Sequence, residues 1–136
     1  MRAVGTYAPT SWDEKTYDQI STNMKMTKAT VAFAFKGQIE GTASVEYLMF
    51  YRDYDEKDPH KSTANYVGLI RLQGKLNGKP GSFAMEDRGT FEAGIARSSL
   101  TIIPGSGTGE LKGISGKGTS DATPKDCNCE LDYELH

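Results

Sequence analysis

The sequence predicts an all-β fold, a closed eight-stranded antiparallel barrel with little or no helix, formed by residues 1–136 as a single domain. Glycine occupies six of the fifteen positions from Pro104 to Gly118, and each glycine costs about 1 kcal/mol relative to alanine inside a helix. From Gly68 to Gly118, at most nine residues separate successive glycines or prolines, which leaves room only for strands and turns. Asn77-Gly78 stands between two alternating apolar runs, the strongest short signal for a β-hairpin. Closing the strands into a barrel removes the unpaired edges of an open sheet.

Three extended segments are expected in the first 36 residues, and the third has the strongest pattern. Val4–Ala8 is short and rich in β-forming residues, and Ser11–Tyr17 alternates only loosely. Residues 25–36 alternate cleanly and place Thr27 and the apolar side chains on one face. A helix over residues 13–26 is the alternative, because apolar residues recur there at helical spacing, although weak helix formers interrupt it.

The next predicted strand, residues 39–52, is apolar on both faces toward its end. Tyrosines and a methionine share the first face, and Leu48 and Phe50 lie on the other. A strand that is covered on both sides packs against a partner subunit or beneath a loop. The polar run over residues 53–63 is expected to be a solvated loop.

The hairpin around Asn77-Gly78 predicts a strand register, because both turn residues tolerate the positive φ of a type I′ turn. With Leu76 opposite Lys79, one row of facing pairs is apolar and is assigned to the barrel interior. That row consists of Gly74–Gly81, Leu72–Phe83, Ile70–Met85 and Gly68–Asp87. Arg71 and Glu86 fall on the outer face, where they are expected to form an ion pair worth less than about 1 kcal/mol. A register slip of one residue would turn that pair inward and is the open alternative.

The rest of the chain is expected to complete the barrel. Residues 88–92 finish the second strand of the hairpin, and a sharp corner is expected at residues 104–109. The remaining predicted strands are 95–103, 110–119 and 129–135, with a polar connection over 123–128. The last strand alternates cleanly, and it can close the sheet onto the first strand.

Charge and hydropathy exclude two classes of partner. Sixteen basic residues against eighteen acidic ones give a formal net charge of −2 without a basic cluster, so no nucleic acid partner is expected. The longest aromatic-aliphatic run, Tyr47–Tyr51, is far shorter than the roughly 20 residues of a membrane-spanning helix, so no membrane partner is expected. Residues 1–20 lack the apolar segment of a secretory signal, which predicts a bacterial-type cytoplasmic location.

No metal or cofactor is predicted. Cys127 and Cys129 point to the same face of an extended chain, too close for an unstrained disulfide and without the further ligands of a metal site. They are interpreted as reduced thiols, with metal or redox chemistry as the alternative. His60 lies in the polar loop and is interpreted as an exposed residue and not a catalytic one. Because only His60 and His136 are available, no Ser-His-Asp set is expected.

Several phrases of the sequence resemble those of one known family. They are Glu46–Met49, Tyr66–Leu69, Gly81–Phe83, Gly89–Phe91, Pro104–Leu111 and Leu131–Tyr133. They span nearly the whole chain, and the phrase Pro-Gly-Ser-Gly-Thr-Gly-Glu-Leu is distinctive. The chain is therefore similar to the small bacterial proteins of domain of unknown function 3224. The resemblance implies a barrel like that of allene oxide cyclase, but no activity, because a shared scaffold carries no chemistry by itself.

Three functional hypotheses follow, and whether the protein is an enzyme is left open, with a non-catalytic role favoured. The first is binding of a small apolar or aromatic ligand inside the barrel, oriented by Asp87 or Glu46. The second is a filled barrel that acts as a homo-oligomer or interaction protein through its outer apolar residues. The third is an isomerase or cyclase in which Glu46 or Asp87 shuttles a proton. The candidate ligand-binding residues are Tyr47, Tyr51, Tyr66, Phe83, Met85, Asp87 and Glu46, with Trp12 as a further lining residue.

Overall fold

The computed structural model describes residues 1–136 and consists mainly of β-strands. Its only helical element is η1, a single 3-10 turn over Pro59–Lys61. No helix has the length and apolar character needed to cross a membrane. The strands are β1 (Arg2–Gln19), β2 (Lys25–Gly37), β3 (Ile39–Asp53), β4 (Thr63–Leu76), β5 (Lys79–Glu92), β6 (Ile95–Ile102), β7 (Thr108–Gly109), β8 (Ile114–Ala122) and β9 (Cys127–Leu135).

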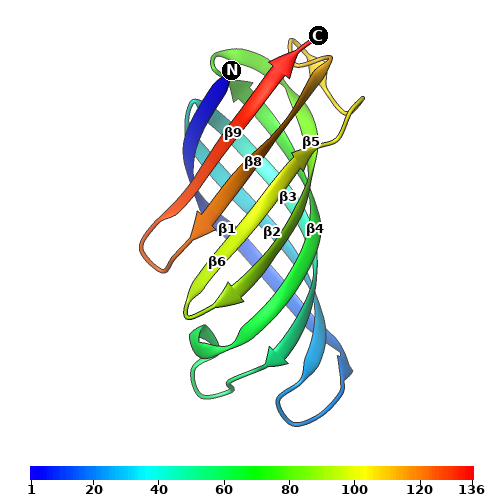
Figure 1. The fold of residues 1–136 in the computed structure, drawn as a ribbon, viewed down its shortest axis with the longest axis vertical. Helices are drawn as coiled ribbons and strands as arrows, with labels where there is room; N and C mark the ends of the chain where they lie inside the picture. The colour runs from blue at the N-terminus through cyan, green and yellow to red at the C-terminus, as the bar shows by residue number, and fades with distance from the viewer.

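Eight of these strands form one antiparallel sheet that curls into a ring, which confirms the predicted fold class (Figure 1). Neighbours in the ring follow the order β1, β2, β3, β4, β5, β6, β8, β9, and each pair is antiparallel. The ring closes where β9 pairs with β1, as predicted. β7 is a two-residue addition that pairs with Gly81 and Ser82 of β5.

The β4–β5 hairpin has the predicted register. Asn77 and Gly78 both have positive φ, 48° and 83°, and Leu76 faces Lys79 across the turn. All four facing pairs of the predicted interior row form, so the register slip is excluded. The large side chains of that row are buried: Ile70, Leu72, Phe83 and Met85.

The N-terminal segments are extended, as predicted, but they form one strand and not two. The helix considered for residues 13–26 does not form, and Val4–Ala8 and Ser11–Tyr17 are parts of the single 18-residue strand β1. β2 pairs with β1 along almost its whole length, with irregularities after Pro9 and Thr16. Pairing with β2 along almost the whole segment therefore decides its conformation, although the local sequence pattern for a strand is weak.

The glycine-rich stretch also differs, because the strand predicted over residues 110–119 begins only at Ile114. The preceding residues form turns, in which Leu111 N–H donates to the Thr108 carbonyl and Ile114 N–H to the Leu111 carbonyl, at 3.1 and 3.2 Å. Leu111 is completely buried, so it anchors these turns to the core. Gly113 has a φ of 84°, a value that favours glycine and does not belong to a strand, so β8 begins only after this residue.

The predicted ion pair between Arg71 and Glu86 does not form. Both residues lie on the outer face as predicted, but the Arg71 guanidinium donates to Gln73 Oε1 at 3.0 Å and to Ser82 Oγ at 3.3 Å. Ser82 and Glu86 are the two diagonal neighbours of Arg71 across the hairpin. Two neutral acceptors on one side satisfy the guanidinium, and an exposed ion pair is worth too little to compete.

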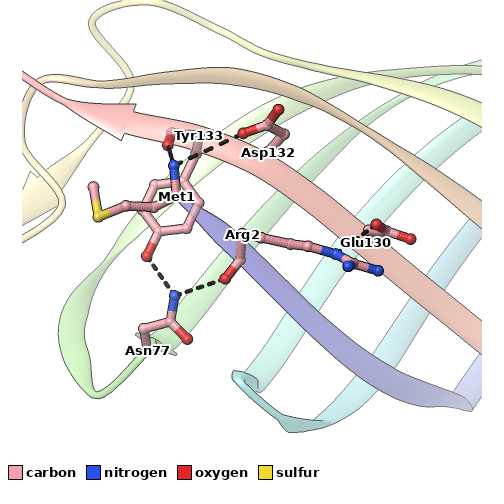
Figure 2. A network of polar contacts seen from close by, with 6 residues as sticks. All are labelled: Met1, Arg2, Asn77, Glu130, Asp132 and Tyr133. Carbon is pink, nitrogen blue, oxygen red and sulfur yellow. Dashed lines mark hydrogen bonds and ion pairs between the residues drawn. The ribbon is translucent and has the colours of Figure 1, made fainter.

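One end of the barrel carries a polar network (Figure 2). The Asn77 amide donates to the Tyr133 hydroxyl at 2.7 Å and to the Arg2 carbonyl at 3.2 Å. The Arg2 guanidinium in turn pairs with Glu130 at 2.6 Å. The turn between β4 and β5 is thereby tied to β1 and β9 across the end of the barrel.

Candidate functional site

The barrel is filled at the end shown in Figure 2 and hollow at the opposite end. A cavity of about 290 Å³ lies there, bordered by the β5–β6 turn, the β8–β9 turn and the loop after β3. Ten of its sixteen lining residues are hydrophobic. Six aromatic side chains form much of its wall: Tyr7, Trp12, Phe33, Tyr47, Tyr66 and Phe91.

β1 borders the opening of the cavity because it has a neighbouring strand on only one side there. β9 pairs with β1 only from Arg2 to Thr6, whereas β2 pairs with it as far as Gln19. The irregularity after Pro9 shifts the register by one residue, so that Trp12 faces the buried residue Val31 and shares its inward side. Trp12 is nevertheless 50% exposed, so its indole stands at the rim with half of its surface free.

The aromatic side chains of the wall support one another. Trp12 stacks against Tyr47 with 6.4 Å between ring centroids, and Tyr47 meets Tyr66 edge to face at 5.4 Å. Tyr7 meets Phe33 edge to face at 5.0 Å. Rings at these separations stabilise each other, so the wall is a mutually supported set of side chains.

Two glycines make room for the central tyrosines. Tyr47 faces Gly68 on β4, and Tyr66 faces Gly89 on β5. A Cβ at Gly68 would lie 2.7 Å from Tyr47 Cδ1, and one at Gly89 would overlap the Tyr66 hydroxyl. Because neither glycine has a side chain, both rings can lie across the neighbouring strand.

Asp87 lies behind the two tyrosines and is only 4% exposed. Its Oδ2 accepts a hydrogen bond from the Tyr47 hydroxyl at 3.1 Å, whereas its Oδ1 has no hydrogen-bond partner. Burial raises the pKa of the Asp87 carboxyl. The nearby Ser98 hydroxyl, whose hydrogen bond in the structure is to Tyr66, and the Tyr47 hydroxyl favour the charged form and offset only part of this shift. The fold thus retains a buried polar atom that it does not itself satisfy, at a cost of about 1–3 kcal/mol.

The phenols near the cavity are neutral at physiological pH. Burial raises the pKa of Tyr7, Tyr47 and Tyr66, the last to about 12, and the nearby Asp87 carboxylate raises it further at Tyr47 and Tyr66. The Tyr66 hydroxyl is hydrogen-bonded to Ser98 at 2.6 Å, and the Tyr7 hydroxyl to Ser120. The interior therefore presents hydroxyl groups and aromatic faces, not phenolate charges.

Both cysteines point to the same face, as the spacing predicts, and both are free. The structure shows that this face is the interior. Cys127 is half-buried and lines the cavity, whereas Cys129 is 4% exposed. Burial raises the pKa of both thiols, and the Asp87 carboxylate adds to the effect at Cys129, whose pKa reaches about 12. Both residues are consequently thiols and not thiolates near neutral pH.

Of the predicted ligand-binding residues, Tyr47 and Tyr66 line the cavity and Asp87 lies behind them. Phe83 and Met85 are each 1% exposed and belong to the filled part of the barrel. The interior is therefore neither wholly filled nor wholly open. The interior is packed between Asp87 and the end of the barrel that carries the Asn77–Tyr133 hydrogen bond, and it is hollow between Asp87 and the opposite end.

The other two predicted residues lie away from the cavity. Tyr51 is farther along β3, where its hydroxyl donates to Glu14 Oε2 at 2.7 Å in a separate polar hollow. Glu46 is exposed on the outer face, within 3.8 Å of Lys28 Nζ and within hydrogen-bond distance of Thr30. The strand alternation explains this placement, because Glu46 and Tyr47 must point to opposite faces.

Sequence reasoning missed several cavity residues, among them Tyr7, Phe33 and Phe91. A signal existed for Phe33, because the alternation of residues 25–36 places it on the same face as buried Val31. Tyr7 and Phe91 had no local signal, since their positions depend on pairing with distant strands. His60 is exposed, as predicted, but it lies at the rim of the cavity.

Comparison with known proteins identifies one family. The family described as "Protein of unknown function (DUF3224)" matches residues 3–134. The chain is also similar to the 1.84 Å crystal structure of a protein with unknown function from the DUF3224 family of Shewanella oneidensis MR-1. That structure has a TM-score of 0.74 and 20% sequence identity, with coverage of 100% of this chain and 98% of the other, so it supports the fold alone. No curated protein matches the chain. The expected likeness to allene oxide cyclase stays a prediction.

Proposed function

Since the chain belongs to the DUF3224 family, whose function is unknown, we propose a function from its cavity: the barrel binds a small, neutral, aromatic ligand at its open end. The observation that supports this proposal is the wall of mutually contacting aromatic rings around a cavity of about 290 Å³. Cavities of this kind, mostly apolar with a few polar groups, are typical of small-molecule sites. The half-exposed indole of Trp12 supplies a free face on which a ligand ring can stack.

The size of the cavity limits the ligand to about two fused rings, because an apolar cavity of about 150 Å³ holds one benzene molecule. A ligand of ten to twelve heavy atoms that gains about 0.5 kcal/mol per atom would bind with a dissociation constant on the order of 100 μM. The neutral phenols and the buried Asp87 favour an uncharged ligand, because no lysine or arginine lines the cavity to compensate an anionic one.

Titration calorimetry with 2-naphthol tests the proposal, with the anion 2-naphthalenesulfonate as the charged counterpart. The neutral compound should bind, and Trp12→Ala should weaken its binding about three- to tenfold through the loss of ring stacking. Tyr17→Ala is the matched control, because Tyr17 is also on β1 and 54% exposed but does not line the cavity. Absence of heat with 2-naphthol at millimolar concentration, or equal losses in the two variants, would contradict the proposal.

One observation favours an isomerase or cyclase as a second candidate function. Such an enzyme needs a buried carboxyl with a raised pKa, and Asp87 meets this requirement, whereas Glu46 is exposed on the outer face. The shuttle also requires contact between Asp87 and the ligand. Carbon-13 NMR of the Asp87 carboxyl during a pH titration, with and without 2-naphthol, tests that contact: an unchanged titration curve at saturation would eliminate this candidate.

A further inference from the structure

The outer surface of the barrel carries an apolar patch formed by Leu48, Val67 and Leu69. These side chains are 49%, 45% and 59% exposed, and they lie on the neighbouring strands β3 and β4. Leu48 faces Val67 directly, and Leu69 lies two residues farther along β4, on the same face. A hollow on the surface includes all three residues. Adjacent apolar side chains with this exposure indicate an interaction surface.

Charged residues flank the patch in two rows that cross the strands from β2 to β5. The positive row contains, in strand order, Lys28, Leu48, Val67 and Arg88. The negative row contains, in the same order, Thr30, Glu46, Leu69 and Glu86. All eight side chains are exposed, and neither Arg88 nor Glu86 forms an ion pair within the chain. The surface therefore presents adjacent rows of opposite sign around an apolar centre.

We infer that this surface binds a second copy of the chain, with a twofold axis that lies in the interface and runs across the strands, midway between the two rows. Rotation about this axis places the positive row of one copy over the negative row of the other. Val67 then meets the partner's Leu69, and Arg88 meets the partner's Glu86. Leu48 lies over the partner's Glu46, whose charge Lys28 of the same chain already offsets at 3.8 Å. The symmetry produces each contact twice, so the patch is complementary to itself on β4, where apolar side chains meet, and on β5, where opposite charges meet.

The charge pattern also favours this axis over one that runs along the strands. A twofold axis along the strands, centred on β4, would exchange β3 with β5 and place Glu46 over the partner's Glu86. Like charges in such a contact are unfavourable. Three apolar side chains make a small centre, so the dimer belongs to the weak class of interfaces and should dissociate in the micromolar range or above.

Charge reversal tests the arrangement, with sedimentation equilibrium as the assay over micromolar to submillimolar concentrations. Glu86→Arg alone and Arg88→Glu alone should each weaken self-association at least tenfold, because each creates two like-charge contacts per dimer. An equimolar mixture of the two variants should associate at least as tightly as the native chain, since a positive surface then meets a negative one. The double variant E86R/R88E should associate like the native chain.

Lys79→Glu is the matched control, because it changes the net charge as Arg88→Glu does but lies at the far end of β5, outside the patch. It should leave the association unchanged, and thermal unfolding should show all variants folded. A native chain that is monomeric throughout the concentration range would overturn the inference. So would a mixture that associates no more tightly than its separate components.

Discussion

Replacement of Asp87 by asparagine is expected to stabilise the protein near pH 8. Asp87 is 4% exposed, its Oδ1 has no partner, and burial raises the pKa of its carboxyl. Asparagine retains an oxygen that can accept the hydrogen bond from Tyr47 but cannot ionise. Because the amide N–H2 takes the place of the unpaired oxygen, the gain comes from removing the buried charge, and it should increase the free energy of unfolding near pH 8 by about 1–3 kcal/mol. For 136 residues, an unfolding entropy of about 2.1 cal/mol/K per residue converts this gain into about 4–10 °C in Tm.

The gain should depend on pH in one direction. Because the folded-state pKa of Asp87 is raised above the unfolded value, the carboxyl is protonated in both states at low pH and costs nothing there. As pH rises above about 4, the carboxyl ionises first in the unfolded chain. The free energy of unfolding of the native sequence therefore falls relative to that of the Asp87→Asn variant, until the pH passes the folded-state pKa of Asp87. The difference between the two proteins should therefore be small near pH 4 and widest near pH 8.

Urea unfolding of both proteins at a series of pH values measures this difference, with circular dichroism as the signal. Other carboxyls titrate equally in the two chains, so their effects cancel in the comparison. Glu86→Gln is the control, because Glu86 is the adjacent residue on the exposed face, and its replacement should change stability by less than about 0.5 kcal/mol. A destabilised D87N protein near pH 8, or a difference that is the same at every pH, would refute the reasoning about Asp87.

Leu72→Ala should lower the free energy of urea unfolding by about 2–5 kcal/mol, because Leu72 is completely buried in the filled half of the barrel. Leu69→Ala on the outer face is the control and should lower it by less than about 1 kcal/mol. Similar losses in the two variants would mean that the core is misplaced. Tyr133→Phe should lower the free energy of unfolding by about 0.5–1.5 kcal/mol, because the hydrogen bond to Asn77 is lost. In a double-mutant cycle with Asn77→Gly, the losses of the two single variants should not add up in the double variant. Strict additivity would show that the hydrogen bond is not made. Cys127 should react slowly with an aromatic disulfide reagent near pH 8, because the pKa of its thiol is raised. Since Cys127 lines the cavity, bound 2-naphthol should slow this reaction further. An unchanged reaction rate in the presence of 2-naphthol would place the ligand elsewhere.

The sequence by itself determined the strands whose signals are local. Asn77-Gly78 sets the turn type and the register of the β4–β5 hairpin, and alternation with period two then decides which side chains face inward. This is why the interior row with Phe83 and Met85 was predicted correctly. The same parity already placed Glu46 on the face opposite Tyr47, so its position outside the cavity could have been deduced.

Only the tertiary structure decided where the interior is filled and where it is open. Trp12 reaches the cavity rim because β2 pairs with β1 through a bulge, and the opening exists because β9 ends its pairing with β1 at Thr6. Both facts depend on strands that are distant in sequence, which no local pattern encodes. Alternation assigns a side chain to a face, but the lengths of the neighbouring strands determine whether that face packs against others, as at Met85, or borders a cavity, as at Tyr47.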